Sequence, residues 1–408
     1  MSELITPGRA LELVSGNVGP LGAEECPLAG AAFRYAAEDI AASEAYPWFS
    51  FSAMDGFAVA SGELATASPD SPVVLPVSDE IPAGDTRKLA LAPGTVMKIM
   101  TGAPLPEGAD AVVMKEVVTE SGRKAKFAAP VPAWRDVNRA GEEIRVGRVL
   151  VAKGQRLAPP VVGLLAAMGI VKVRVHGRPR VAVIATGDEL VPPGGERTHG
   201  RIYDSVSPML SAALSGWGAA GVELRRCGDD ETLLRDQVAQ AMENAEIVLT
   251  VGGVSVGDYD FAVPAMVGAG FKQVFHGVRQ KPGKPLFFGV TDNGKCAFGL
   301  PGNPASALVS TALYVRRALE IMAGSLDPAP RSLQAVAGAE LINRTDRTQF
   351  IRVVARVRDD GITECEAAGG QGSYMLSSFA ASDALAELPP GPMTLPAGEP
   401  VTVYPLNW

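Results

Sequence analysis

Paired cysteines and paired histidines are missing from this sequence, and their absence excludes several kinds of site. Only three histidines are present, and none stands at metal-ligand spacing from another. The four cysteines are scattered and form no CxxC pair: Cys26, Cys227, Cys296 and Cys365. We therefore expect buried, reduced thiols, and neither a histidine-based zinc site nor a Ser-His-Asp triad. Any catalysis would rest on carboxylates, lysines and backbone amides.

Long apolar runs and an excess of basic residues are missing too. The most apolar stretch, residues 158–171, has two prolines at its start and is too short to span a bilayer. A formal net charge of −8 disfavours non-specific binding to nucleic acid. The first residues, MSELITPGRALEL, contain no basic segment that leads into an apolar run. We therefore expect no secretory signal, no membrane role and a cytoplasmic location.

The length of 408 residues exceeds what one hydrophobic core usually holds, so two to four domains are expected. Residues 1–45 are predicted to be helical, because Ala10, Leu11 and Val14, and later positions 31–40, recur at helical spacing. Residues 47–141 carry short β-prone runs between prolines and glycines, which is typical of a β-rich module. A further helix is predicted through VVGLLAAMG.

From about residue 178 to residue 325, apolar strands alternate with loops and helices. Four strands are predicted, over RVAVIATG, VELRRCG, EIVLTVGG and KCAFGL, with helices over SPMLSAALSGWG and DETLLRDQVAQAMENA. Unbroken apolar strands between helices indicate a mostly parallel sheet covered on both faces, which binds ligands at the carboxyl ends of its strands. Residues 328–408, with QFIRVVARV and VTVYPL, predict a small β domain.

Glycine-rich loops follow three of the four strands, where backbone amides can approach phosphate groups closely. In GLPGNP, residues 299–304, Asn303 and Pro304 fit the N-cap and the first position of a helix, whose amides would face an anion. A plain helix start explains the Asn-Pro pair equally well. In QKPGKPLFFG, Lys281 and Lys284 flank a Pro-Gly turn. They suit a polyanion, and solvated surface lysines are the simpler alternative.

Carboxylates gather at the predicted strand ends. They are Asp188, Glu189, Asp229, Asp230, Asp258 and Asp260. Acids that converge beside phosphate-binding loops repel one another unless they share a cation, and Mg²⁺ with its preference for oxygen ligands is the natural candidate. Asp230 precedes a helix and fits an N-cap better than a ligand. In the β-rich module, Asp55 and Gly56 have the chemistry of a hairpin turn.

Eight strings occur in family order across residues 5–405, and through them the sequence resembles the MoeA family, which includes the E domain of gephyrin. They are SAMDGFAVA, TGAPLPEGADAVV, ATGDEL, YDSVSPML, GGVSVGDYD, KPGKP, GLPGNP and QGSYMLSSF. The resemblance implies a multidomain α/β plus β fold. Its parts would be an N-terminal segment and linking domain over 1–46 and 142–176, an inserted β-rich module over 47–141, a three-layer α/β molybdopterin-binding domain over 177–327, and a C-terminal β-barrel over 328–408.

The activity that the resemblance implies is that of a transferase, a molybdopterin molybdenumtransferase of molybdenum cofactor biosynthesis. Such an enzyme inserts molybdenum from molybdate into adenylylated molybdopterin, with Mg²⁺-assisted hydrolysis that releases AMP. The family also implies a homodimer in which the β-rich module of one subunit faces the α/β domain of the other. Transient contacts with a molybdopterin adenylyltransferase and with apo-molybdoenzymes are implied as well.

The matching motifs also imply roles for individual residues. The implied catalytic residues are Asp55, Thr101, Glu189 and Asp260, and the implied metal ligands are Glu189, Asp229, Asp230 and Asp260. The implied cofactor-binding residues are Gly252, Gly253, Ser255, Lys281, Lys284, Pro301, Gly302, Asn303 and Pro304. Molybdate is a dianion that uncompensated carboxylates would repel, so it needs a separate patch of donors, for which the resemblance implies Arg352 and Ser373.

Three positions depart from the family pattern: Phe51 before Ser52, Val206 within YDSVSPML, and Glu143 where an Asp is common. The departures remove polar contacts but keep the main acids. Two alternatives to the molybdenum-inserting enzyme therefore stay open. One is a paralogue that inserts tungsten or acts on a modified pterin. The other is a non-catalytic scaffold of the gephyrin type, although a scaffold has no need to keep mutually repelling acids such as Glu189 and Asp260.

Overall fold

A computed structural model of the chain describes residues 4–254 and 261–407. The chain divides into two compact units. The first comprises residues 1–38, 153–162 and 172–408, and the second comprises residues 39–152 and 163–171. Within the described residues, no helix combines the length and the apolar character that crossing a bilayer requires.

The first unit contains the predicted α/β sheet. Its strand order is β16-β13-β17-β21-β20-β18, in which the first four strands are parallel and β20 is antiparallel to both of its neighbours, β21 and β18. The strands are β13 (Arg180–Thr186), β16 (Gly221–Cys227), β17 (Ile247–Val251), β18 (Lys272–His276), β20 (Phe287–Val290) and β21 (Cys296–Leu300). The prediction of a mostly parallel sheet built on the four apolar runs is confirmed.

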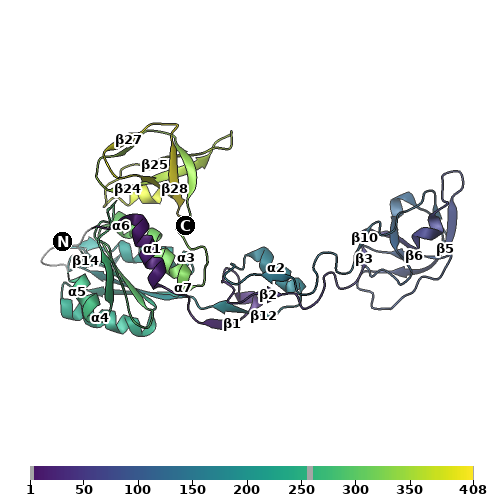
Figure 1. Cartoon of the computed structure of the whole chain (residues 1–408), viewed down its shortest axis with the longest axis horizontal. Coiled ribbons are helices and arrows are strands. Elements are labelled where there is room, and N and C mark those ends of the chain that lie inside the picture. Colours follow the sequence, from purple (N-terminus) through teal and green to yellow (C-terminus); the bar gives the residue numbers. More distant parts are fainter. Residues whose placement is uncertain (1–3, 255–260, 408) are drawn as a thin grey trace. The chain divides into compact units, whose positions relative to one another are not determined.

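Helices cover both faces of this sheet, because alternate side chains of each strand point to opposite sides. Val183, Leu249 and Phe298 are neighbours in register and pack into one core with helices α1, α3, α6 and α7. Ala182 and Val248 enter the opposite core with α4 and α5 (Figure 1). The helices are α1 (Pro7–Asn17), α3 (Val206–Gly216), α4 (Glu231–Asn244), α5 (Ala262–Gly268), α6 (Pro304–Ser310) and α7 (Arg316–Met322), with a π-helical turn over Thr311–Val315 between the last two. The three-layer prediction is confirmed.

The C-terminal part of the first unit is a closed β-barrel, as expected. Strands β24, β25, β22, β28 and β26 follow one another, and the pairing of β26 with β24 closes the ring. The elements are β19 (Gln280–Lys281), β22 (Leu333–Ala337), β23 (Leu341–Asn343), β24 (Thr348–Val357), β25 (Thr363–Ala367), α8 (Ser377–Ala380), β26 (Ala384–Leu388), β27 (Met393–Leu395) and β28 (Pro400–Pro405). Short strand β19 pairs with β24, so the segment with Lys281 is held against the barrel.

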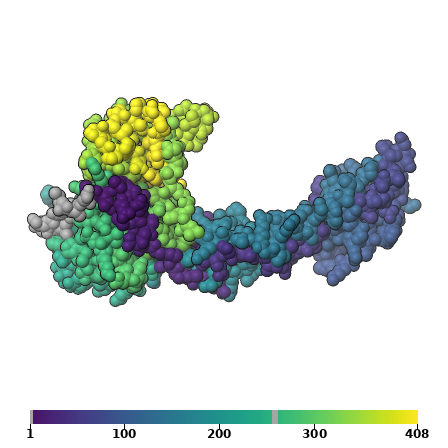
Figure 2. Space-filling model, viewed as in Figure 1, coloured from purple at the N-terminus to yellow at the C-terminus, as the bar shows by residue number. Residues whose placement is uncertain are grey.

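The N-terminal segment is only partly helical. Helix α1 is capped by Thr6, whose hydroxyl accepts from the Arg9 amide, and it buries Ala10 and Val14. Figure 2 shows α1, in purple, on the surface of this unit. The predicted helix over residues 31–40 is wrong. There the backbone pairs with distant chain instead, since the Ala36 amide donates to Gln155 and the Ala37 amide to Arg174. These tertiary pairings outweigh a local helical spacing.

The remaining elements of the first unit are short. Strand β1 pairs with β12 in antiparallel fashion, and β14 pairs with β15 in parallel fashion. Their bounds are β1 (Ala23–Pro27), β12 (Lys172–His176), β14 (Leu190–Val191) and β15 (Ile202–Tyr203). Helix α2, predicted through VVGLLAAMG, spans Pro159–Ala167, so it belongs partly to each unit.

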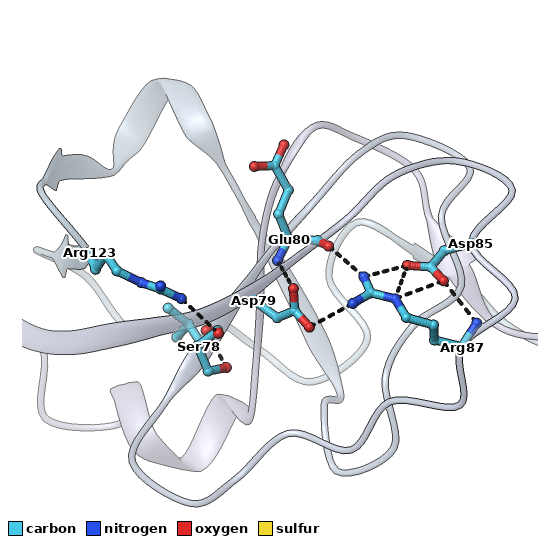
Figure 3. Close-up of polar contacts among 7 residues, drawn as sticks. Ser78, Asp79, Glu80, Asp85, Arg87 and Arg123 are labelled. Atoms are coloured by element: carbon cyan, nitrogen blue, oxygen red, sulfur yellow. Dashed lines mark hydrogen bonds and ion pairs between the residues drawn. The ribbon is translucent and has the colours of Figure 1, made fainter.

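The second unit holds the predicted β-rich module, a six-stranded sheet of order β7-β4-β6-β5-β9-β8. Its strands are β4 (Gly56–Val59), β5 (Val73–Ile81), β6 (Val96–Ile99), β7 (Ala111–Met114), β8 (Thr119–Ser121) and β9 (Lys124–Phe127). Two smaller ladders join β2 (Ile40–Ala41) to β11 (Val149–Val151) and β3 (Phe51–Ser52) to β10 (Val137–Asn138). Arg87 ties the loop after β5 to that strand, because it donates to Asp85, to Asp79 and to the carbonyl of Glu80 (Figure 3).

Candidate functional site

A cavity of ≈ 620 Å³ lies at the carboxyl ends of β13, β17 and β21. Its walls include Thr186, the last residue of β13, and Gly252, Gly253 and Gly302 from the loops that follow β17 and β21. Gly252 has φ +99°, and a Cβ there would lie 2.7 Å from the Thr186 hydroxyl and 2.8 Å from the Thr186 carbonyl oxygen. Only glycine allows this approach, and it leaves backbone rather than side chains on the cavity wall. Such a wall is suited to phosphate groups.

The GLPGNP loop also lines this cavity, which we call the glycine-rich cavity. Gly302, Asn303 and Pro304 line it, whereas Pro301 is buried beside it. Asn303 occupies the N-cap of α6 and Pro304 its first position, as predicted, but within the described residues the Asn303 side chain makes no capping hydrogen bond. The amide of Ala305 donates to the Ser373 carbonyl at 3.0 Å. That donor therefore holds the loop that carries Ser373 and does not face an anion.

The predicted acids separate into different positions. Glu189 and Asp229 line the glycine-rich cavity. Asp230 instead caps α4, where its carboxylate accepts from the Leu233 amide at 2.8 Å. Asp260 and Ser255 lie outside the described residues. Within the described residues no group of three acidic, histidine or cysteine side chains is arranged to hold a metal ion.

Glu189 and Asp229 nevertheless have the chemistry that Mg²⁺ requires. The Glu189 carboxylate folds back over Gly187, where a Cβ would lie 2.3 Å from its Oε2 atom, and the side chain remains exposed to the cavity. The amide of Asp188 donates to the Asp229 carboxylate at 3.3 Å, which orients it. Magnesium in proteins usually takes one or two carboxylates and completes its shell with waters and substrate phosphates. Two carboxylates beside glycine-rich loops that suit phosphate groups fit that pattern.

Side chains that were not among the predicted site residues also line this cavity, and two of them are Asp204 and Tyr374. Asp204 is buried, accepts from the Ser207 amide at 3.0 Å and so starts α3. Tyr374 also lines the cavity and is 68% exposed. Val206, one of the departures from the family pattern, lies in the same wall and is buried. Phe51 and Glu143 belong to the second unit.

A second cavity, of ≈ 510 Å³, lies on the other side of the first turn of α6. Lys281, Ser306, Arg347, Gln371 and Ser373 line it together with backbone of the Pro-Gly turn. Among the described residues it has two cationic lining groups and no carboxylate. We call it the oxyanion cavity, because this combination of charges and hydroxyls suits a small dianion.

The two lysines of the KPGKP turn differ in position. Lys281 is half-buried and lines the oxyanion cavity, whereas Lys284 is exposed and is not among the residues that line it. Between them, Gly283 has φ +89°, and a Cβ there would lie 2.6 Å from the Ser310 hydroxyl. The turn therefore packs tightly against α6.

Arg352 does not line the oxyanion cavity, but it hydrogen-bonds to the loop that lines it. The side chain is fully buried, and its Nη2 donates to the carbonyls of Gly370 and Gly372 at 2.7 and 3.2 Å. Its backbone amide donates to Gln371 at 2.9 Å. Burial lowers the pKa of Arg352, and its Nε and Nη1 atoms have no partner among the described residues. Of the predicted pair, Ser373 faces the cavity and Arg352 supports the loop that carries it.

Sequence reasoning missed Ser306, Arg347 and Gln371. Gln371 opens the recognised string QGSYMLSSF, and Ser306 stands two positions after Pro304, the last residue of GLPGNP. Arg347 lies in RTDRTQF, where nothing local distinguishes it from a surface arginine. It reaches the cavity because β24 pairs with β19, which carries Lys281.

In the second unit the structure brings Asp55 and Thr101 together. The Asp55 carboxylate accepts from the Thr101 amide at 2.9 Å, from the Thr101 hydroxyl at 2.8 Å and from Lys115 Nζ at 2.9 Å. The Thr101 amide, then Lys115, then the Thr101 hydroxyl hold the pKa of Asp55 well below its usual range. The hairpin interpretation of Asp55-Gly56 is wrong, because β3 pairs with β10 while β4 pairs with β6 and β7. Lys115 was not predicted.

Comparison with known proteins agrees with these features. Residues 5–169 match the MoeA N-terminal region (domain I and II), residues 182–321 a probable molybdopterin binding domain, and residues 334–406 the MoeA C-terminal region (domain IV). The chain is 35% identical to molybdopterin molybdenumtransferase 2 of Mycobacterium tuberculosis over 374 residues, which cover 90% of this chain and 91% of that protein. It is 34% identical to the molybdopterin molybdenumtransferase of Haemophilus influenzae, with 95% of both chains covered. A crystal structure of the molybdopterin biosynthesis MoeA protein of Pyrococcus horikoshii superposes with a TM-score of 0.84 at 30% identity, covering 99% of this chain and 100% of that one.

Proposed function

The chain belongs to the MoeA family, and from this premise we propose that it is a molybdopterin molybdenumtransferase, a transferase of molybdenum cofactor biosynthesis. It would insert molybdenum from molybdate into adenylylated molybdopterin and release AMP. One observation carries this proposal. Two cavities of different chemistry flank the first turn of α6, one walled by glycine backbone and acids and the other by cations and hydroxyls.

The glycine-rich cavity is proposed to hold the pterin and its pyrophosphate. Gly252, Gly253, Gly302 and Asn303 offer backbone at the strand ends, where α/β sheets bind ligands. Its volume of ≈ 620 Å³ lies within the usual range for small-molecule sites. The proposed set of pterin-site residues also includes Ser255 and Asp260, and Pro301 and Pro304 of the GLPGNP loop.

The oxyanion cavity is proposed to hold molybdate. Lys281 and Arg347 supply two positive charges, and Ser306 and Ser373 supply hydroxyl donors. A dianion placed there is separated from the carboxylates of Glu189 and Asp229, which would repel it. Arg352 contributes indirectly, because it fixes the carbonyls of Gly370 and Gly372 and so the position of Ser373.

The proposed reaction hydrolyses the phosphoanhydride of the adenylylated pterin. Water adds to one phosphorus, the bridging P–O bond breaks, and AMP leaves. Mg²⁺ held by Glu189 and Asp229, with Asp260 in the same proposed set, would supply positive charge to the phosphates. Asp230 is the least suited of the proposed ligands, since its carboxylate is engaged by the start of α4. We propose that turnover depends on the carboxylate of Glu189.

Several further features are part of the proposal because of the family relationship. The protein would be a cytoplasmic homodimer of four-domain subunits. In such a dimer Asp55 and Thr101 of one subunit would act at the glycine-rich cavity of the other. An ionised Asp55, with both oxygens already engaged by Thr101 and Lys115, is suited to orient a neighbouring donor rather than to release a proton. Contacts with an adenylyltransferase and with apo-molybdoenzymes would be transient.

The test mixes the purified full-length protein with adenylylated molybdopterin, Mg²⁺ and molybdate and follows AMP release. Glu189→Gln is expected to keep the fold and pterin binding while turnover falls about a hundredfold or more, because a carboxylate at the reaction centre is lost. Glu196→Gln, an exposed acid of the same connection that does not line the cavity, is the control and should turn over normally. Tungstate in place of molybdate tests the paralogue alternative. Pterin binding without AMP release under either oxyanion would refute the enzymatic proposal in favour of a scaffold.

A further inference from the structure

A third polar cavity of the first unit, of ≈ 480 Å³, is rich in arginine. Among the described residues it shares no lining residue with the glycine-rich cavity or the oxyanion cavity. Glu320 is the only carboxylate among the described residues that line it. Its arginines are Arg34, Arg156, Arg178, Arg316 and Arg331. We call it the arginine cavity.

The charges of this cavity do not balance. Three of the arginines have a carboxylate partner, at 2.5, 3.0 and 3.0 Å: Arg34 with Glu24, Arg316 with Glu320, and Arg331 with Asp327. Among the described residues Arg156 and Arg178 have none, and Arg156 instead lies over the ring of Phe33, 4.7 Å from its centroid. Both of these arginines are exposed. Two exposed positive charges without a carboxylate partner among the described residues therefore line this cavity.

A buried donor in the same cavity has no acceptor. Arg34 is 9% exposed, and its Nη2 donates to Glu24 and to the carbonyl of His176. Its Nε atom is buried and has no partner among the described residues. Such a group costs free energy unless something accepts from it. Because this atom is buried, it does not itself face a ligand, and the exposed Arg156 and Arg178 supply the donors for one.

We propose that the arginine cavity binds the phosphoryl dianion of a small phosphate compound. The charge of −2 matches the two uncompensated guanidinium groups, and the planar fork of arginine matches phosphate oxygens. The volume lies in the usual small-molecule range, so an organic group can accompany the phosphoryl group. Tyr35 and Trp217 line the cavity and offer ring surface to such a group. This proposal does not depend on the activity proposed above.

Trp217 lines this cavity and neither the glycine-rich cavity nor the oxyanion cavity, so its fluorescence distinguishes binding here from binding at those two sites. Its ring lies 5.0 Å from the Arg316 guanidinium, so a bound anion should change its fluorescence. The full-length protein is titrated with inorganic phosphate, with AMP and with adenosine, which lacks the phosphoryl group. Saturable quenching or enhancement is expected with the first two and not with adenosine. Trp217→Phe should abolish the signal, and Lys281→Gln, in the oxyanion cavity, should leave it unchanged.

Arg156→Gln and Arg178→Gln are each expected to weaken phosphate binding about tenfold, because each removes a charged hydrogen-bond donor. Arg226→Gln is the matched control, an exposed arginine of β16 outside the cavity, and should bind as the parent does. Melting temperatures would verify that the variants are folded. Equal affinity in parent, Arg156→Gln and Arg178→Gln would overturn the proposal, as would equal binding of adenosine. Tighter binding of AMP than of phosphate would support a monoester ligand, and equal binding would support phosphate itself.

Discussion

Replacement of Lys281 separates the proposed molybdate site from the pterin site. Lys281 lines the oxyanion cavity and has no carboxylate partner among the described residues, so its ammonium is free to pair with a dianion. A hydrogen bond to a charged group contributes about 1.5–3 kcal/mol. Since about 1.4 kcal/mol corresponds to a factor of ten, Lys281→Gln should raise the molybdate concentration for half-maximal AMP release by roughly 10- to 100-fold.

The same turn provides the matched control. Lys284 is three residues away, carries the same charge and is exposed outside the cavity. Lys284→Gln should leave the molybdate dependence unchanged, and both variants should keep the parent's melting temperature and its half-saturation for the pterin substrate. Steady-state AMP release measured against molybdate at saturating pterin gives the comparison. Equal effects of the two substitutions, or an effect of Lys281→Gln on pterin alone, would refute the assignment of the oxyanion cavity.

Two further predictions concern carboxylates whose roles the structure distinguishes. Asp230→Ala should lower the free energy of unfolding by about 1 kcal/mol in denaturant titrations, because it removes the cap of α4. Asp230→Asn should keep both the cap and turnover. Loss of turnover in Asp230→Asn would instead make Asp230 a metal ligand. The pKa of Asp55 is lower in the folded protein than its value of about 3.9 in the unfolded chain, so the ionised carboxylate stabilises the folded state. This contribution to the free energy of unfolding is complete above the unfolded pKa and is lost as the pH falls through the folded pKa. Lys115→Gln should raise the pKa of Asp55, measured by NMR titration of its carboxyl carbon, but not to the usual value, because the Thr101 amide remains the largest stabilising contact. An unchanged pKa in that variant would show that Lys115 does not act on Asp55.

The α/β sheet could be predicted because its information is local. The runs of β13, β17 and β21 are apolar and long enough for buried strands, whereas β16 at the sheet edge is mostly exposed. Asp230 begins a helix by a contact only three residues away. The parallel order follows from the alternation of strands with helices. The prediction failed for residues 31–40, where backbone pairing with residues 155 and 174 replaces the helix that the spacing indicated. Pairing over such a distance leaves no periodic trace in the segment itself.

The site was predictable to the extent that its residues lie in recognisable motifs. Glu189, Asp229 and the loop of Asn303 do line one cavity. Arg347 and Lys115 could not be identified, because sheet pairing brings each of them to its partners. For Arg347 this is the pairing of β24 with β19. For Lys115, which follows β7, it is the pairing of β7 with β4. The distinction between Lys281 and Lys284 also required the packing of the Pro-Gly turn against α6.

Local patterns thus determine which residue types stand at the strand ends: glycines that allow backbone to approach a ligand, acids that suit a hard cation, and lysines on a stiff turn. Tertiary structure alone decides which of them share a cavity. It directs Asp230 to a helix start and Glu189 to a cavity wall, although both follow strands of one sheet. It also buries Arg352 behind the loop that Ser373 presents. The reason is physical: a charge or hydroxyl acts over a few ångströms, and contacts at that range join segments that the sequence keeps far apart.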